Sequence, residues 1–172
     1  MYLAVLFAMP LVTYHTTNKI PNTMEPHYYN VDVNWSQDRK GVMCSPELIR
    51  NAGSCIEVAT PPEFSKGMPG IWSPEHLFTA SVSSCLMTSF LAIAENSKLE
   101  FSNFSCNSKG KMEQVDGKFL MTEILLEPTV TINDEKYRER AERVLQKSER
   151  ICLISNSIKS KITMVPTINV VP

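Results

Sequence analysis

A nearly continuous apolar stretch from Trp72 to Asn96 constrains the fold of this chain of 172 residues more than any other feature. It opens with Ser73 and Pro74, which predict a helix start. A serine side chain accepts hydrogen bonds from the free N–H groups of the first turn, and proline has no N–H to leave unpaired there. A helix that is apolar on all sides is normally buried, so we expect this one to form the centre of the core.

A single cysteine, Cys85, lies in the middle of this predicted helix. Free cysteines often act as small hydrophobic residues, so an inert core thiol is the simplest interpretation. A second segment favours chemistry instead, because Cys152 follows the charged stretch 136–150 where the sequence turns apolar. A thiol reacts as the thiolate, which requires electropositive surroundings.

The rest of the chain predicts an α+β fold. Asp116 and Gly117 predict a hairpin turn, and a second, amphipathic helix over 136–150 follows a capping Asp134. Alternating or apolar runs predict strands at residues 29–35, 42–44, 55–59, 101–117, 118–132 and 162–171. Because strands and helices do not alternate regularly, we expect a mainly antiparallel sheet around the buried central helix.

The length suits one domain, which we assign to residues 28–172, with residues 1–27 as an N-terminal extension. The apolar run 3–12 is too short to span a bilayer and lacks the basic start of a signal peptide. We interpret this extension as a loose arm or an extended start, with Met24 as an alternative first residue. A signal or anchor, or a partner-binding segment, are the remaining interpretations.

The composition argues against several classes of protein. A net charge of −1 with 20% charged residues gives no basic excess, so we expect no nucleic-acid and no membrane partner. Five cysteines without regular pairing do not describe a secreted disulfide framework, and the chain has no CxxC motif for a structural zinc site. We therefore expect a cytoplasmic globular protein in which Cys44, Cys55 and Cys106 are structural strand residues.

Two sequence blocks together resemble the OsmC/Ohr family of thiol-dependent hydroperoxide peroxidases. The first runs from Trp72-Ser73-Pro74-Glu75-His76 to Ser84-Cys85, and the second begins Cys152-Leu153-Ile154-Ser155-Asn156. The likeness covers roughly residues 28–170, and the pair of blocks is more specific than either cysteine alone. The resemblance implies an intertwined OsmC-like homodimer. A dimer would also cover a helix that one small sheet cannot enclose.

The resemblance also implies a reaction without metal, flavin or haem. The Cys85 thiolate would attack an organic hydroperoxide, release an alcohol and become a sulfenic acid, and Cys152 would condense with it to a disulfide. An external dithiol, of the lipoyl type in the family, would reduce that disulfide. The alternative is a non-catalytic OsmC-fold stress protein or a small-molecule-binding module.

In the family an arginine after the first strand activates the thiol, and a glutamate holds the arginine. Glu75 matches that glutamate by motif and spacing, although a first-turn acid can also serve the helix dipole alone. Arg39 is our choice for the cation and Lys40 the second choice. A plain solvated turn is the bland interpretation, and Gln37 at the key position would leave the thiol without a cation. His76 is interpreted as a surface or packing residue.

The spacing of Glu75 and Cys85 predicts which subunit the glutamate serves. Ten residues of helix rise about 15 Å and leave the two side chains about 80° apart around the axis. Glu75 therefore cannot touch Cys85 of its own helix. If two such helices pack antiparallel about a two-fold axis, Glu75 acts on the partner's thiol.

Overall fold

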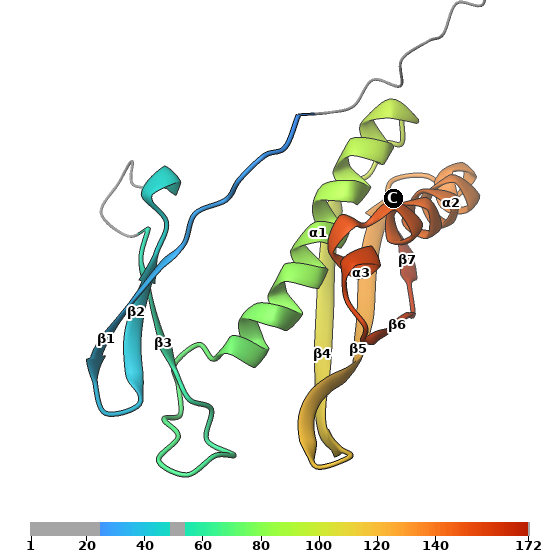
Figure 1. Cartoon of the computed structure of the whole chain (residues 1–172). Helices are drawn as coiled ribbons and strands as arrows, with labels where there is room; N and C mark the ends of the chain where they lie inside the picture. Colours follow the sequence, from blue (N-terminus) through green and yellow to red (C-terminus); the bar gives the residue numbers. More distant parts are fainter. Residues whose placement is uncertain (1–24, 49–53, 172) are drawn as a thin grey trace, which may run out of the picture.

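The fold is taken from a computed structural model, which describes residues 25–48 and 54–171. Most of the predicted extension, and with it the expectation of a loose arm, lies outside the described residues. The described chain has two β-sheets, with a long central helix beside the larger one (Figure 1). The predicted α+β class with mainly antiparallel pairing is confirmed.

The central helix α1 (Pro74–Asn96) begins where the sequence predicts. Ser73 caps it, because its side chain accepts a hydrogen bond from the His76 N–H at 3.3 Å. Within one chain the helix buries only one face, which consists of Val82, Leu86, Phe90, Ile93 and Ala94. By length and composition α1 is also the one helix of the described chain that could cross a membrane, but its buried face packs as a core helix does.

The first sheet is antiparallel, in the order β1 (Asp32–Gln37), β2 (Lys40–Cys44), β3 (Ile56–Ala59), with the short 3-10 helix η1 (Pro46–Leu48) after β2. The sheet stands to one side of α1 (Figure 1). A backbone hydrogen bond joins this sheet to the start of α1. In it the Ala59 N–H donates to the Trp72 carbonyl at 2.8 Å, just before α1 begins.

The second sheet is built on the hairpin of β4 (Asn103–Val115) and β5 (Lys118–Ile132). Asp116 and Gly117 both have positive φ, 49° and 77°, as the predicted tight turn requires. β6 (Lys161–Met164) and β7 (Thr167–Val170) both pair parallel to β5. The single last strand predicted over 162–171 is therefore wrong. Pro166 divides it because proline has no N–H for the ladder.

The second predicted helix is confirmed as α2 (Arg138–Ile151), preceded by the 3-10 helix η2 (Glu135–Tyr137). A third helix, α3 (Leu153–Ser157), was not predicted, because five residues are too few to show a helical period. Ile154 of α3 packs on a buried cluster of α1 and β5 side chains: Val82, Leu86, Ile124 and Leu126. This packing holds α3 against the middle of α1.

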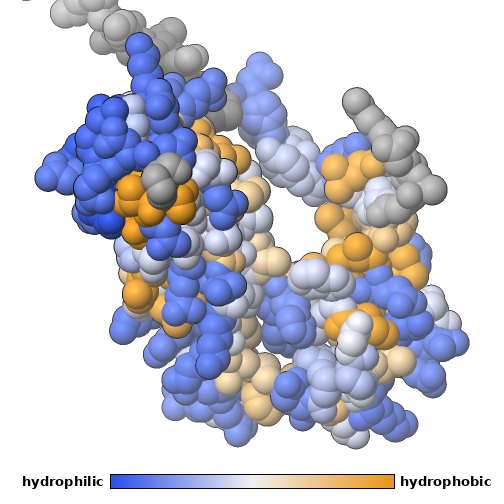
Figure 2. Space-filling model, turned by 180° about the vertical axis from the view of Figure 1, so that it is seen from behind, coloured by the Kyte–Doolittle hydropathy of each residue, from blue (hydrophilic) through white to orange (hydrophobic). Residues whose placement is uncertain are grey.

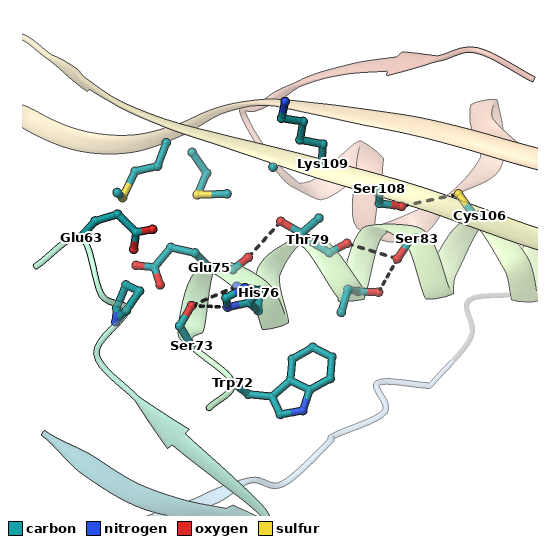
Figure 3. A pocket seen from close by; sticks show the side chains of 15 residues that line it. Glu63, Trp72, Ser73, Glu75, His76, Thr79, Ser83, Cys106, Ser108 and Lys109 are labelled. Carbon is teal, nitrogen blue, oxygen red and sulfur yellow. Dashed lines mark hydrogen bonds between the residues drawn. The ribbon is translucent and has the colours of Figure 1, made fainter. Parts of the chain in front are cut away.

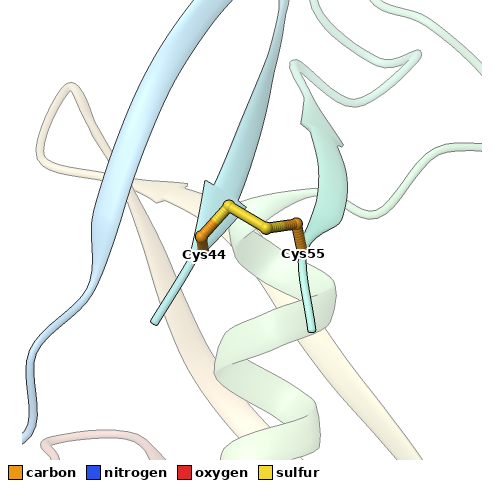
Figure 4. The surroundings of a disulfide bond; sticks show 2 residues. All are labelled: Cys44 and Cys55. Atoms are coloured by element: carbon orange, nitrogen blue, oxygen red, sulfur yellow. A yellow bond between two sulfur atoms is a disulfide. The ribbon is translucent and has the colours of Figure 1, made fainter. Parts of the chain in front are cut away.

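The first sheet contains a disulfide between Cys44 and Cys55 that the sequence did not predict (Figure 4). Met43 faces Ile56 across β2 and β3, so the next two residues outward are directly opposite each other. Their Cα atoms lie 4.3 Å apart, close to the spacing of such pairs in antiparallel strands. The two cysteines are strand residues as expected, but they are bonded, and the free cysteines of the described chain are Cys85, Cys106 and Cys152.

Candidate active site

The structure brings Cys85 and Cys152 together. Cys85 lies halfway along α1 and is half-buried, whereas Cys152 lies between α2 and α3 and is fully buried. The two thiols are free, and they lie close enough for each to shift the pKa of the other. The separation of their Cα atoms, which we expect to be within about 7 Å for a pair that can form a disulfide, stays a prediction.

The turn between α2 and α3 fixes the position of the Cys152 sulfur. The Cys152 N–H donates to the Glu149 carbonyl at 3.2 Å, which closes α2. Its carbonyl accepts the Asn156 N–H at 3.1 Å, and its sulfur accepts the Ser155 N–H at 3.5 Å. Cys152 thus ends one helix and caps the next, so its backbone is held from both sides and its sulfur from the α3 side.

The surroundings of Cys85 favour its thiolate. Burial alone would raise the pKa of this thiol, because desolvation disfavours the charged form. Hydrogen bonds from the Cys152 side chain, from the Ile154 and Leu153 backbone and from the Ser89 side chain outweigh burial. The net result is a pKa below the ordinary cysteine value.

The surroundings of Cys152 act in the opposite direction. Burial and the hydrogen bond with Cys85 raise the pKa of Cys152, and the side chain and N–H of Ser155 offset only part of this. These opposite shifts favour the negative charge on Cys85 and the proton on Cys152. Cys85 is therefore the thiol that ionises more readily, and Cys152 is the one that keeps its proton.

The expected cation is not beside Cys85 within the chain. Arg39 lies in the exposed turn between β1 and β2, and its carbonyl accepts the Thr60 N–H at 3.1 Å. Lys40 is paired with Glu57 at 2.7 Å. Figure 1 shows this turn well apart from α1 and α3. In the described part of one chain, only neutral hydrogen-bond donors lower the pKa of Cys85.

Glu75 faces a separate cavity of about 620 Å³ between α1 and the β4–β5 hairpin. Figure 3 shows Glu63 and Glu75 at one end of this cavity and Cys106 at the other. One carboxylate oxygen of Glu75, Oε2, is buried and has no hydrogen-bond partner among the described residues. Cys85 does not line the cavity, so the structure does not unite Glu75 with the thiol pair inside one chain.

His76 belongs to the helix cap. Its Nδ1 lies 2.8 Å from the Ser73 hydroxyl, and its ring meets the Trp72 ring edge to face at 6.2 Å between centroids. These contacts fit the packing role that the sequence favours.

The hydrogen-bond donors around the thiols were not predicted from the sequence. Ser89 lies one turn after Cys85 on α1, so its position follows from helical spacing. The backbone of Ile154 faces Cys85, and Ser155 faces Cys152, only because α3 docks on α1. Both residues belong to the second sequence block, which was the one available signal for them.

The fold and the paired thiols define an α+β protein with a two-cysteine site. The chain belongs to the family of OsmC-like proteins, whose pattern matches residues 67–166. The resemblance stated from the sequence is thereby confirmed. The matched region includes α1, β4, β5 and both free thiols of the site, but not β1 to β3.

Individual relatives are distant. An uncharacterized protein of Bacillus subtilis, YmaD, is 22% identical over 144 residues, which is 82% of this chain and 93% of that protein. An OsmC-like protein of unknown function from Vibrio cholerae superposes with a TM-score of 0.71 at 20% identity, covering 82% of this chain and 99% of the other. An organic hydroperoxide resistance protein from Elizabethkingia anophelis superposes with a TM-score of 0.67 at 19% identity, covering 87% and 100%. These structures establish the fold.

Proposed function

We propose that this protein is a cysteine-based peroxidase that reduces organic hydroperoxides to alcohols. The observation that carries the proposal is the adjacent pair of free thiols, in which the pKa of Cys85 is lowered and that of Cys152 is raised. A two-cysteine peroxidase needs one thiol of lowered pKa that attacks the hydroperoxide, and a second thiol that then attacks the resulting sulfenic acid. Membership of a family that includes organic hydroperoxide resistance proteins supports the same reaction.

The first step oxidises Cys85. Its thiolate attacks the distal oxygen of the hydroperoxide, the O–O bond breaks, and the alcohol leaves with one proton. Cys85 then carries a sulfenic acid. Exposed and half-buried apolar side chains near the thiol, including Met87 and Ile154, suit alkyl or lipid hydroperoxides.

The second step forms a disulfide. Cys152 attacks the Cys85 sulfur, water leaves with the sulfenic oxygen, and the Cys85–Cys152 bond closes. An external dithiol, of the lipoyl type in the family, then returns both sulfurs to thiols by thiol–disulfide exchange. Organic hydroperoxide and dithiol are therefore the two partners that the reaction consumes.

A homodimer would complete this site. The outer face of α1 is exposed in one chain, including its apolar residues Met87 and Leu91. Hydrophobic side chains also lie on both sides of the open space between the first sheet and the rest of the chain (Figure 2). In an intertwined dimer these surfaces would cover each other, and Arg39 and Glu75 of one chain would approach the thiols of the other. We assign this assembly to the cytoplasm.

Titration with an alkyl hydroperoxide tests the proposal. We expect one equivalent of tert-butyl hydroperoxide to remove two free thiols per chain, and a dihydrolipoyl dithiol to restore them. The matched control is Cys106→Ala, which removes a free thiol outside the pair and should titrate with the same stoichiometry. If the thiol count of the purified protein does not change, the peroxidase proposal is wrong.

The cavity beside Glu75 favours a second candidate function, a non-catalytic small-molecule-binding or stress protein. Its volume of about 620 Å³ is within the range of ligand pockets. In that case a ligand would protect the protein against thermal unfolding while the thiol count stayed constant under peroxide. The same titration therefore separates the two functions.

A further inference from the structure

Ser155 lies in α3, three residues after Cys152, and its hydroxyl group is unusual in its surroundings. The hydroxyl oxygen is buried and has no hydrogen-bond partner of normal geometry among the described residues. A buried polar group without a partner costs roughly 1–3 kcal/mol, so such a group calls for an explanation. The backbone N–H of the same residue donates to the Cys152 sulfur at 3.5 Å, so Ser155 lies beside this thiol.

The protonation state of Cys152 explains this hydroxyl. A neutral thiol is a weak hydrogen-bond acceptor, whereas a thiolate accepts strongly. The Ser155 N–H donates to the Cys152 sulfur at 3.5 Å, which places the hydroxyl of the same residue beside that sulfur. The Ser155 side chain also acts to lower the pKa of Cys152. A hydroxyl that has little to bind in the resting state gains a charged partner once Cys152 ionises.

Building on the proposed peroxidase function, we infer that Ser155 is a positioning residue for the resolving step, and that its hydroxyl and N–H together hold the Cys152 thiolate while it attacks the Cys85 sulfenic acid. The same two donors stabilise Cys152 as the leaving thiolate if the external dithiol attacks Cys85 of the disulfide. The inference assigns Ser155 to Cys152 chemistry and not to the first reaction of Cys85 with peroxide.

Other groups around Cys152 do not supply this help. On α1 the facing titratable group is Cys85, which raises the pKa of Cys152. On α2 the neighbouring Glu149 and Arg150 take part through their backbone carbonyls, which accept the Cys152 N–H and the Asn156 side-chain amide. Within the described chain, Ser155 is the source of the contacts that favour the Cys152 thiolate.

The size of the effect follows from thiol nucleophilicity. Lowering the pKa of an attacking thiol increases its thiolate fraction but reduces its intrinsic reactivity, with a Brønsted coefficient of about 0.4–0.5. When the pKa lies above the working pH, each tenfold gain in thiolate gives about a threefold gain in rate. Loss of the Ser155 hydroxyl should therefore slow resolution about two- to fivefold at pH 7. At alkaline pH both thiols are ionised and the thiolate of higher pKa is the more reactive one, so the difference should disappear and then reverse.

Single-turnover kinetics provide the test. We would mix reduced protein with one equivalent of tert-butyl hydroperoxide, trap sulfenic acid with dimedone, and count free thiols over time. Ser155→Ala should form sulfenic acid at the wild-type rate, convert it slowly to the disulfide at neutral pH, and match or exceed the wild-type rate of resolution at alkaline pH. Ser155→Thr, which keeps the hydroxyl, should resolve like the wild type.

Ser157→Ala is the matched control. Ser157 lies on the same short helix, but it is exposed and its hydroxyl donates to the Leu153 carbonyl at 2.8 Å. The inference is wrong if Ser155→Ala resolves with the same rate and pH profile as Ser157→Ala, or if Ser155→Thr resolves as slowly as Ser155→Ala.

A second measurement separates this inference from the peroxidase proposal. In a Cys85→Ser, Cys106→Ala background, Cys152 is the free thiol that remains in the described chain, and its pKa can be measured from iodoacetamide reaction rates. Adding Ser155→Ala should raise that pKa, and adding Ser157→Ala should not. This comparison needs no peroxide, so an unchanged pKa overturns the role of Ser155 even if peroxide is reduced. A raised pKa supports the role of Ser155 even if the protein does not reduce peroxide.

Discussion

Gly110 of β4 faces Thr79 of α1 so closely that a Cβ atom at residue 110 would overlap the Thr79 hydroxyl. That hydroxyl is itself held by a hydrogen bond to the Glu75 carbonyl at 2.9 Å, so it cannot move away freely. This contact sets how closely the first half of α1 approaches the β4–β5 hairpin. It also determines the shape of the cavity into which Glu75 points.

Gly110→Ala should therefore destabilise the fold by about 1–3 kcal/mol, the usual cost of adding an atom to a packed contact. Urea unfolding monitored by circular dichroism would measure the change. Lys109→Ala is the control, because Lys109 is the exposed neighbour on the same strand and its truncation adds no atom. Equal stability of the two variants would show that α1 can move off the hairpin at little cost.

Cys152→Ser should still consume one equivalent of alkyl hydroperoxide but stop at the Cys85 sulfenic acid. The reason is that Cys85 does not need Cys152 to break the O–O bond, whereas the disulfide needs both sulfurs. Mass spectrometry after dimedone trapping would detect the stalled state. Full steady-state turnover of this variant with a dithiol would remove Cys152 from the mechanism.

The pH dependence of alkylation should differ between the two thiols. Because hydrogen bonds lower the pKa of Cys85, its thiolate persists to lower pH than that of an ordinary cysteine, and its reaction rate should fall only below that range. The pKa of Cys152 is raised, so Cys152 should need more alkaline solution. Iodoacetamide rate profiles with identification of the labelled peptide would measure both. A Cys85 midpoint at or above the ordinary cysteine value would contradict the assignment.

The two cysteines of the first sheet should matter for stability and not for chemistry. Replacing Cys44 and Cys55 by alanine removes a bond that closes a short loop, which typically costs about 2–4 kcal/mol. Peroxide turnover at low temperature should remain at the wild-type level. Thermal unfolding and a peroxidase assay on the double variant would check both halves. Unchanged stability, or lost turnover in a folded variant, would contradict the expectation.

Subunit mixing tests where Glu75 acts. If each site takes its thiols from one chain and Glu75 from the other, a Cys85→Ser chain paired with a Glu75→Gln chain has one intact site. Since half of randomly mixed dimers are heterodimers and each holds one of two sites, about a quarter of wild-type activity should return. No recovery after demonstrated subunit exchange would mean that Glu75 serves its own chain.

The features predicted from the sequence were those set by local chemistry. Ser73 and Pro74 predict the start of α1, and the Asp116–Gly117 turn predicts the hairpin, because the backbone conformations concerned depend on the residues themselves. The pairing of the two thiols in space follows the family pattern and not any local rule. Pro166 was a visible signal that the last strand is divided, and it was missed.

The features that escaped prediction depend on contacts between distant segments. The bond between Cys44 and Cys55 follows from the register of β2 against β3, which residue spacing does not reveal. Ser155 becomes important only because α3 folds against α1. Arg39 lies apart from α1 within one chain, and only the proposed dimer would bring it to the thiols.

The positions of the cysteines along the chain also set an order of events during synthesis. A chain made from its N-terminus presents Cys44 and Cys55 first, and these two residues can find each other before Cys85 has been added. Cys85 then remains without Cys152 until 67 further residues have been added, because 152 − 85 = 67. An early bond between Cys44 and Cys55 therefore leaves the nascent Cys85 two fewer thiols with which to pair wrongly.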